Sequence, residues 1–217
     1  CQQLEDDPSR LARLQRYSNM GPLTRLSFEA TRPEGRGTDT EERAQFHQAY
    51  ELALAFAEDP KGWLVLTGPS GCGKTHLAAA IANRVVERGN PVFFVFVPDL
   101  LDHLRSTFTP ESRVTYDRVF DQVKNAPLLV LDDLGKESTS EWAREKLYQI
   151  INYRYNAQLP MVVTTDLPLD ELERTEPRIA SRLADTRFSV VLGIDATDFR
   201  IDRPPSTRYQ RSSTSDW

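Results

Sequence analysis

Five short runs of hydrophobic residues recur along the chain, and longer segments with hydrophobic residues at helical spacing separate them. The runs are WLVLT (63–67), VFFVFV (92–97), LLVLD (128–132), MVVTT (161–165) and FSVVL (188–192). Continuous apolar runs of this length are typical of parallel strands that helices cover on both faces. The pattern therefore predicts a doubly wound α/β domain around a five-stranded parallel sheet.

The segments between the runs indicate helices. Hydrophobic residues at helical spacing predict one helix over 40–57. A second helix is predicted over about 138–156, where Ser138 and Glu141 form a capping box ahead of an apolar face. The stretch 98–125, between the second and third strands, predicts two more helices.

Two flanking segments differ from this pattern. Proline and glycine punctuate residues 1–38, which predicts a loosely structured lead-in with a short helix near 11–16 and little chemistry. Residues 202–217 are polar and contain proline, as is typical of a flexible tail. Because the chain begins with Cys1 and not with methionine, we expect an upstream module that ends in this lead-in. The folded domain is expected over 39–201.

Composition and charge narrow the class of protein. The net charge of -5, with 39% hydrophobic and 27% charged residues, suits a soluble globular protein, so any contact with nucleic acid needs a local basic patch. No apolar run approaches the roughly 20 residues of a membrane-spanning helix, and no signal-peptide pattern opens the chain. With two cysteines at unpaired spacing, we expect a cytoplasmic protein without a disulfide framework.

The sequence GPSGCGKT at 68–75 matches the phosphate-binding pattern G-x-x-x-x-G-K-[ST], between a predicted strand and a predicted helix. In this setting backbone N–H groups surround phosphates, Lys74 reaches the outer phosphates and Thr75 ligates Mg²⁺. We interpret Cys72 as a small filler of the loop, and His76 either lines the nucleotide or lies at the surface. The candidate nucleotide-binding residues here are Gly68, Pro69, Ser70, Gly71, Cys72, Gly73, Lys74, Thr75 and His76.

Asp132 and Asp133 follow the third apolar run directly. In ATPases with this loop, a carboxylate at the end of such a strand orients Mg²⁺, and the next acidic residue polarises the attacking water. We assign the metal to Asp132 with Thr75 and the base-like role to Asp133. The alternative is that both aspartates only cap the end of the strand. The N-K-x-D pattern that reads guanine is absent from the sequence, which favours ATP over GTP.

Four blocks of the sequence resemble one known family. They are GWLVLTGPSGCGKTHLAAAIAN, LLVLDDLGKESTSEWAREKLYQIINYRYN, LPMVVTTDL and RIASRL. Together they are similar to the DnaC/DnaI-type helicase loaders and the related IstB transposition helpers of the AAA+ ATPases, over about residues 20–200. The resemblance implies a five-stranded P-loop core that binds and hydrolyses ATP and acts on single-stranded DNA and a partner protein. Full AAA+ proteins carry a helical lid after the last strand, whereas few residues follow that strand here. We therefore expect a lid that is reduced, as in these loaders, or absent because the chain has been cut.

The resemblance implies roles for residues beyond the loop. Thr165 and Asp166 correspond to the sensor of the γ-phosphate, although the loaders usually have asparagine in place of Asp166. Arg182 corresponds to the arginine finger that enters the ATP site of a neighbouring subunit, with Arg178 in support. Arg200 corresponds to a C-terminal sensor arginine. A solvated helix face is the alternative for the arginine pair, and a surface residue is the alternative for Arg200.

The two helices predicted over 98–125 combine cations with aromatic rings, as surfaces that bind single-stranded DNA do. Initiators and loaders are similar in carrying an extra helical element that faces DNA at this place. Core packing is the alternative for the aromatic rings. The candidate residues are Arg105, Phe108, Arg113, Tyr116, Arg118 and Lys124.

Two functions fit these features best. The first is an ATPase that loads a replicative helicase onto single-stranded DNA and is active as a homo-oligomer. The second is an IstB-like helper of a transposase, and because the two ATPase cores are alike, the sequence leaves both open. A small-molecule kinase would need an acceptor pocket that the sequence does not show, whereas an ATP-gated binding module with negligible turnover stays possible. Cys1 is also compatible with the last ligand of an upstream zinc module.

Overall fold

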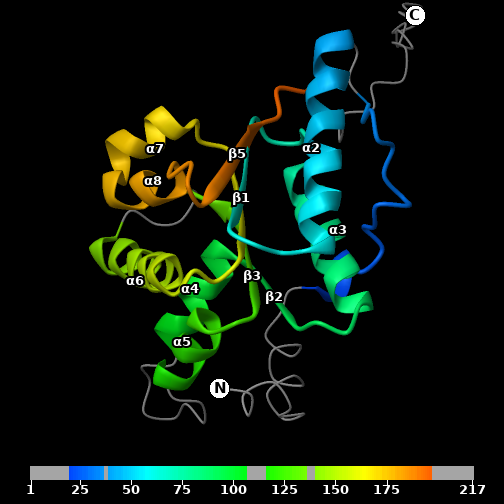
Figure 1. Ribbon diagram of the computed structural model, residues 1–217. Helices are drawn as coiled ribbons and strands as arrows, with labels where there is room; N and C mark the ends of the chain where they lie inside the picture. Colours follow the sequence, from blue (N-terminus) through cyan, green and yellow to red (C-terminus); the bar gives the residue numbers. More distant parts are fainter. Residues whose placement is uncertain (1–19, 37–38, 107–115, 136–139, 197–217) are drawn as a thin grey trace, which may run out of the picture.

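The computed structural model describes residues 20–36, 39–106, 116–135 and 140–196. Its centre is one five-stranded parallel sheet with the strand order β2-β3-β4-β1-β5 (Figure 1), which confirms the predicted sheet. The strands are β1 (Trp63–Thr67), β2 (Val92–Phe96), β3 (Leu128–Leu134), β4 (Met161–Thr165) and β5 (Ser189–Gly193).

Helices cover both faces of this sheet (Figure 1). One face carries α2 (Thr40–Glu58) and α3 (Lys74–Glu87), preceded by the short 3-10 helix η2 (Gly21–Leu23). The opposite face carries α4 (Val97–Ser106), α5 (Tyr116–Lys124), α6 (Glu141–Ala157), α7 (Leu169–Thr175) and α8 (Pro177–Leu183). α2, α4 and α5 confirm the helices predicted over 40–57 and 98–125. Across the four described ranges, no helix combines the length and the apolar character needed to cross a membrane.

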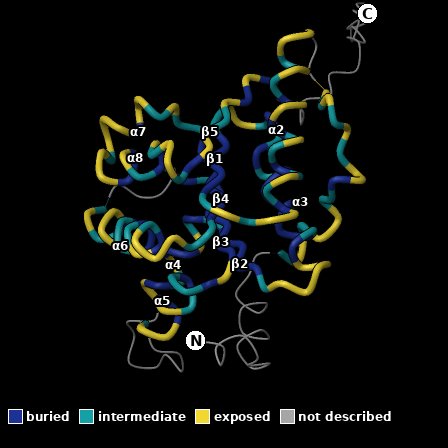
Figure 2. The backbone as a smooth tube through the Cα atoms, in the orientation of Figure 1, coloured by how far each residue is buried: buried dark blue, intermediate teal, exposed yellow. Residues whose placement is uncertain are grey.

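Alternate residues of the strands divide the hydrophobic core into two layers. In β1, Trp63 and Val65 belong to the layer under α4–α8, whereas Leu64 and Leu66 belong to the layer under α2 and α3. Strands buried on both faces need hydrophobic residues at every position, which explains the continuous apolar runs. Figure 2 shows the sheet as a buried strip between two helical layers whose outer turns are exposed.

The start of α6 differs from the sequence-based expectation. Ser140 is the N-cap of this helix, and its hydroxyl accepts a hydrogen bond from Ala143 N–H at 3.3 Å. The predicted capping box of Ser138 and Glu141 is therefore wrong, because a later serine lies where the N–H groups of the first turn converge. Ser138 lies outside the described residues, as does the short helix predicted near 11–16.

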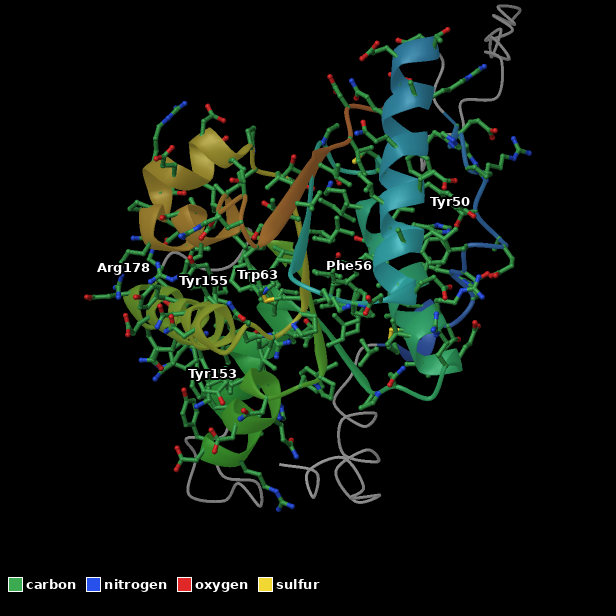
Figure 3. All side chains as sticks on the ribbon, in the orientation of Figure 1. Tyr50, Phe56, Trp63, Tyr153, Tyr155 and Arg178 are labelled. Atoms are coloured by element: carbon green, nitrogen blue, oxygen red, sulfur yellow. The ribbon has the colours of Figure 1, made fainter. Side chains whose placement is uncertain are left out.

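Residues 20–36 pack against α2 and α3, although the sequence predicts a loosely structured lead-in. The side-chain amide of Asn83 on α3 donates to two carbonyls of this segment, at 3.0 and 2.8 Å. Phe28 is 3% exposed, and the hydroxyl of Tyr50 on α2 donates to its carbonyl at 3.3 Å. Figure 3 shows Tyr50 on the side of α2 that faces this segment. The segment is thereby held against α2 and α3.

Candidate nucleotide-binding site

The phosphate loop leaves β1 after Thr67 and enters α3 at Lys74. Gly68 has a φ of 144°, and a Cβ at this position would lie 2.1 Å from the carbonyl oxygen of Ile194, so no side chain fits there. Gly73, the N-cap of α3, has a φ of 103°, a left-handed conformation that glycine adopts at little cost. These two glycines let the chain turn tightly between the strand and the helix.

A pocket of about 590 Å³ lies at this loop, a volume in the usual range of small-molecule sites. It brings together residues from the loop, from the ends of β3 and β4, and from the lead-in. The predicted site residues that line it are Ser70, Gly71, Gly73, Lys74, Thr75, His76, Asp132, Asp133 and Asp166. The other lining residues are Leu26, Ala30, Thr31, Arg32, Gly35, Arg36, Phe46 and Phe96.

The ammonium group of Lys74 is buried within the loop. Its Nζ donates to the carbonyl oxygens of Gly68 and Pro69, both at 2.8 Å, and lies 2.8 Å from Asp166 Oδ1. Cys72 Sγ is 3.6 Å from the same Nζ. The Cys72 thiol has no solvent exposure, and burial raises its pKa, so the thiol has the properties of the loop filler that we expect from the sequence.

Thr75 and Asp132 are in direct contact. The Thr75 hydroxyl donates to the Asp132 carboxylate, with oxygen distances of 3.0 and 3.1 Å. Asp132 is 1% exposed, and this burial raises its pKa even though hydrogen bonds from Thr164 and Thr75 lower it. A hydroxyl and a carboxylate are the hard oxygen ligands that Mg²⁺ prefers. These two adjacent side chains therefore fit the predicted metal site.

Asp133 lies at an irregular turn of β3. The pairing of β3 with β4 shifts register between Leu131 and Leu134, and Asp133 has a φ of 67°. This left-handed conformation is uncommon for residues other than glycine. Successive side chains of a regular strand point to opposite faces, but an irregularity of this kind re-aims them. As a result, both Asp132 and Asp133 line the pocket.

Thr164 on β4 holds this turn in place, although no motif of the sequence singles it out. It is 1% exposed. Its hydroxyl donates to Asp132 Oδ1 at 2.6 Å and accepts a hydrogen bond from Asp133 N–H at 2.9 Å. The available signal in the sequence is the pair of threonines that ends MVVTT, because a buried hydroxyl needs a polar partner. Thr164 thus positions both aspartates at once.

The two predicted sensor residues have different surroundings. Thr165 is fully buried, and its hydroxyl oxygen accepts a hydrogen bond from Leu167 N–H at 3.0 Å. This contact fixes the turn after β4. Asp166 lines the pocket and contacts Lys74. Of the two, Asp166 is the residue that lies beside the phosphate loop.

His76 joins the lead-in to α3. The Thr31 hydroxyl donates to the carbonyl of Ser27 at 2.6 Å, and its oxygen lies 2.8 Å from His76 Nε2. Because a hydroxyl has one proton to give, the imidazole is the donor in the contact with Thr31. Burial lowers the pKa of His76, and the charge of Arg36 lowers it further. His76 therefore anchors the lead-in beside the loop and also lines the pocket.

The lead-in supplies the part of the pocket that sequence analysis misses. We expect little chemistry from this segment, yet Arg32 and Arg36 line the same pocket as its aspartates. The available signal is the basic stretch TRPEGRG at 31–37. Its two arginines place positive charge at the site without belonging to a recognisable motif.

The arginines of RIASRL lie on α8 and line no part of this pocket. Arg182 donates to Asn152 Oδ1 at 3.0 and 2.7 Å, to the Tyr148 hydroxyl at 3.2 Å and to the Arg178 carbonyl at 2.6 Å. The Arg178 guanidinium lies 3.5 Å from the centre of the Tyr148 ring, and 3.8 Å separates it from a carboxylate oxygen of Glu145. Its side chain is 63% exposed. Figure 3 shows Arg178 at the outer edge of the helical layer.

The cations of the candidate DNA-binding segment lie over aromatic rings. Lys124 Nζ is 5.0 Å from the ring centres of Phe120 and Tyr153, and the Arg105 guanidinium is 5.3 Å from that of Trp142. Phe120 is also buried in the core, so the rings have packing contacts as well as bound cations. Arg118 is exposed and Tyr116 is half-buried on the same segment, whereas Phe108, Arg113 and Arg200 lie outside the described residues.

The sequence of this chain is similar to those of known proteins. A family model described as IstB-like ATP binding protein matches residues 38–187. The replicative helicase loader DnaI of Bacillus subtilis is 31% identical over 138 residues, which are 63% of this chain and 43% of DnaI. The replicative helicase loader DnaC of Escherichia coli K12 is 27% identical over 173 residues, which are 76% of this chain and 67% of DnaC. The chain thus spans less than half of DnaI.

Solved structures give the same picture of the fold. The crystal structure of the DnaC helicase loader has a TM-score of 0.67 at 25% identity and covers 81% of this chain and 99% of that chain. The replication initiator DnaA, in a structure with AMPPCP and single-stranded DNA, has a TM-score of 0.65 at 22% identity, covering 79% of this chain and 50% of that chain. These likenesses confirm the predicted P-loop AAA+ fold.

Proposed function

We propose a function that proceeds from one premise: the chain belongs to the IstB-like ATP-binding protein family. The proposed function is that of an ATP-hydrolysing DNA replication factor that delivers a replicative helicase to single-stranded DNA. The observation that carries this proposal is that Lys74, Thr75 and Asp132 meet in one pocket. The names of two similar proteins, the helicase loaders DnaI and DnaC, support the choice of partner.

Each polar residue of the pocket has a role in the proposed reaction. Lys74 and the N–H groups of the loop bind the phosphates of ATP, and the N-terminus of α3 adds positive potential there. Thr75 and Asp132 hold Mg²⁺, which neutralises phosphate charge when it is bound. Asp133 orients a water molecule and accepts its proton. Thr164 positions both aspartates through its hydroxyl.

The lead-in completes the ATP pocket in this proposal. We place the ATPase domain at 39–201, and residues 20–36 close one side of its pocket. Leu26 offers an apolar wall that suits the base, and Arg32 and Arg36 offer cations that suit phosphate or ribose oxygens. The contact between the lead-in and His76 holds these side chains near the loop.

In this proposal, the arginines of α8 promote ATP hydrolysis when several copies of the chain assemble. They line no part of the pocket of their own chain, and a guanidinium suits the charge of a phosphate. From the sequence we predict Arg182 as the finger with Arg178 in support. The contacts favour the reverse order, because Arg182 has hydrogen-bond partners on α6 while Arg178 is exposed. We therefore propose that Arg178 reaches the ATP of a neighbouring copy and that Arg182 supports it.

The proposed surface for single-stranded DNA lies on α4 and α5. Arg105 and Lys124 place cations over aromatic rings there, which is the combination that such surfaces use. We expect the double substitution of Arg105 and Lys124 by alanine to weaken the binding of a fluorescent oligonucleotide, most strongly at low salt. Unchanged binding would remove α4 and α5 from the proposed DNA surface.

The test of the proposed function uses the full-length protein. It is immobilised and presented with the replicative helicase of its host and with any transposase encoded beside it, in ATP and in ADP. Recovery of the helicase in ATP supports the loader function. Recovery of the transposase alone would overturn it. A parallel assay of phosphate release, with and without the helicase and single-stranded DNA, tests whether the partner stimulates ATP hydrolysis.

An IstB-like transposition helper is the second candidate function. The description of the matching family model favours it. The proposed helper uses the same ATP pocket and the same arginines, but its partner is a transposase and its DNA is a target site. The pull-down above separates the two candidates, because each names a different partner.

A further inference from the structure

The contact between Lys74 and Asp166 is the feature that the proposed reaction leaves unexplained. Lys74 Nζ has three oxygen partners at 2.8 Å, namely two loop carbonyls and Asp166 Oδ1. An ammonium group has three protons to donate. Lys74 therefore has to give up at least one of these contacts before it can donate to a phosphate.

The fold places Asp166 beside the loop. β1 and β4 are parallel neighbours, and Thr67 is in register with Thr165. The next residue of each strand is then Gly68 on one side and Asp166 on the other, so the carboxylate meets the base of the loop. The Lys74 side chain is 6% exposed and that of Asp166 is 20% exposed, so water screens this ion pair only weakly.

The negative charge of Asp166 makes it unfavourable for a nucleotide phosphate to replace Asp166 as the partner of Lys74. Asp132, Asp133 and Asp166 line the same pocket as Lys74, Arg32 and Arg36, and Lys74 contacts Asp166 directly. A nucleotide phosphate competes with Asp166 for the Lys74 ammonium and is repelled by the carboxylate it displaces. The repulsion grows with the charge of the ligand, so it is larger for a triphosphate than for a diphosphate.

We propose that Asp166 is a specificity-determining residue that lowers the affinity of the isolated chain for ATP relative to ADP. This inference rests on the proposed ATP site. Its consequence is that an arginine from a neighbouring copy, by adding positive charge at the phosphates, offsets the charge of Asp166. ATP binding is then coupled to assembly, whereas an isolated subunit has little preference for ATP.

The experiment compares wild type, Asp166→Asn and Asp166→Glu by equilibrium titration of fluorescent ATP and ADP analogues, with Mg²⁺ and with a chelator. Asparagine keeps the size of the side chain and removes its charge. We expect Asp166→Asn to bind ATP at least tenfold more tightly, with a smaller gain for ADP, and Asp166→Glu to resemble wild type. Asp170→Asn is the matched control, because Asp170 is 70% exposed and pairs with Arg174 on α7.

Other outcomes overturn the proposal in distinguishable ways. If Asp166→Asn leaves the ratio of ATP to ADP affinity unchanged or lowers it, Asp166 does not disfavour the triphosphate. If the variant also melts at a lower temperature and binds both nucleotides less well, the ion pair only stabilises the loop. Failure of the wild-type chain itself to bind either nucleotide would remove the proposed ATP site and this inference together.

Discussion

At the phosphate loop, polar side chains bond to one another inside the buried carboxyl edge of the sheet, whereas on α8 two arginines lie against an aromatic ring near the surface. Thr75, Asp132 and Thr164 form a continuous set of hydrogen bonds, in which Asp132 and Thr164 are buried. Arg178, by contrast, is 63% exposed. The phosphate loop is placed to bind a ligand within its own chain. The arginine face, Arg178 and Arg182 of α8, is instead placed to contact a molecule outside it. For the proposed function, this difference predicts that mutations can separate nucleotide binding from ATP hydrolysis.

The largest expected effect is on the arginine face. We expect Arg178→Ala to leave ATP binding by the isolated chain unchanged and to lower assembly-stimulated hydrolysis by roughly a thousand-fold, the scale of known arginine fingers. Arg182→Ala should cause a smaller loss, because its guanidinium supports the pair through Asn152. Phosphate release at high protein concentration and nucleotide titration measure the two properties. A full loss in Arg182→Ala with a normal rate in Arg178→Ala would return the finger to Arg182.

The next effect is on the loop itself. We expect Lys74→Ala to weaken ATP binding by about tenfold to a hundredfold, because it removes a charged hydrogen-bond donor to phosphate. The measurement is titration of a fluorescent ATP analogue. Lys61→Ala is the control, because that side chain is 79% exposed and pairs with Asp59. Equal affinity in Lys74→Ala and wild type would mean that this lysine stays with Asp166 in the bound state.

A third effect concerns the support of the aspartates. Thr164→Val keeps the shape of the side chain but leaves the Asp133 N–H and a buried Asp132 oxygen without their shared hydroxyl partner. We expect the free energy of unfolding to fall by about 1–3 kcal/mol, together with a lower rate of ATP hydrolysis. Denaturant unfolding and phosphate release measure these effects. Thr175→Val, in an exposed helix turn, is the control; a variant as stable as wild type would contradict the role of Thr164.

The smallest expected effect has the opposite sign. Burial raises the pKa of Asp132, so the folded chain holds this proton more tightly than the unfolded chain does. Its ionisation at neutral pH therefore costs stability. We expect Asp132→Asn to stabilise the nucleotide-free chain by about 1 kcal/mol. The same substitution should abolish the dependence of ATP binding on Mg²⁺. Thermal unfolding measures the gain against Asp102→Asn, whose carboxylate is exposed, and a lower melting temperature would refute it.

The strands and the phosphate loop could be predicted because local patterns determine them. The run WLVLT is β1 to the residue, and the loop at 68–75 follows it directly. The position of Asp132 follows from the same logic, since the carboxyl ends of parallel strands meet at one edge of the sheet. The role of Thr164 could not be predicted in this way. It depends on a register shift between β3 and β4, which no local pattern of either strand records.

Arginines show the same limit more sharply. Arg154 on α6 has no exposure and donates to four backbone carbonyls at the ends of neighbouring elements. Arg178 on α8 is exposed, and Arg36 lines the pocket from the lead-in. Arg154 and Arg178 both lie on helices and carry the same charge, so the sequence pattern does not distinguish them. Only the three-dimensional contacts separate a structural arginine from one that is available to a ligand.

The close approach of Gly68 to Ile194 has a mechanical consequence. The Ile194 carbonyl occupies the space beside Gly68, and the Ile194 N–H donates to the Thr67 carbonyl at 2.8 Å. The next residue donates its N–H to Gln45 on α2 at 3.1 Å. Residues 194 and 195, which follow β5, therefore connect the backbone at the start of the phosphate loop to α2. A shift of β5 relative to α2 would thus also move the backbone beside Gly68.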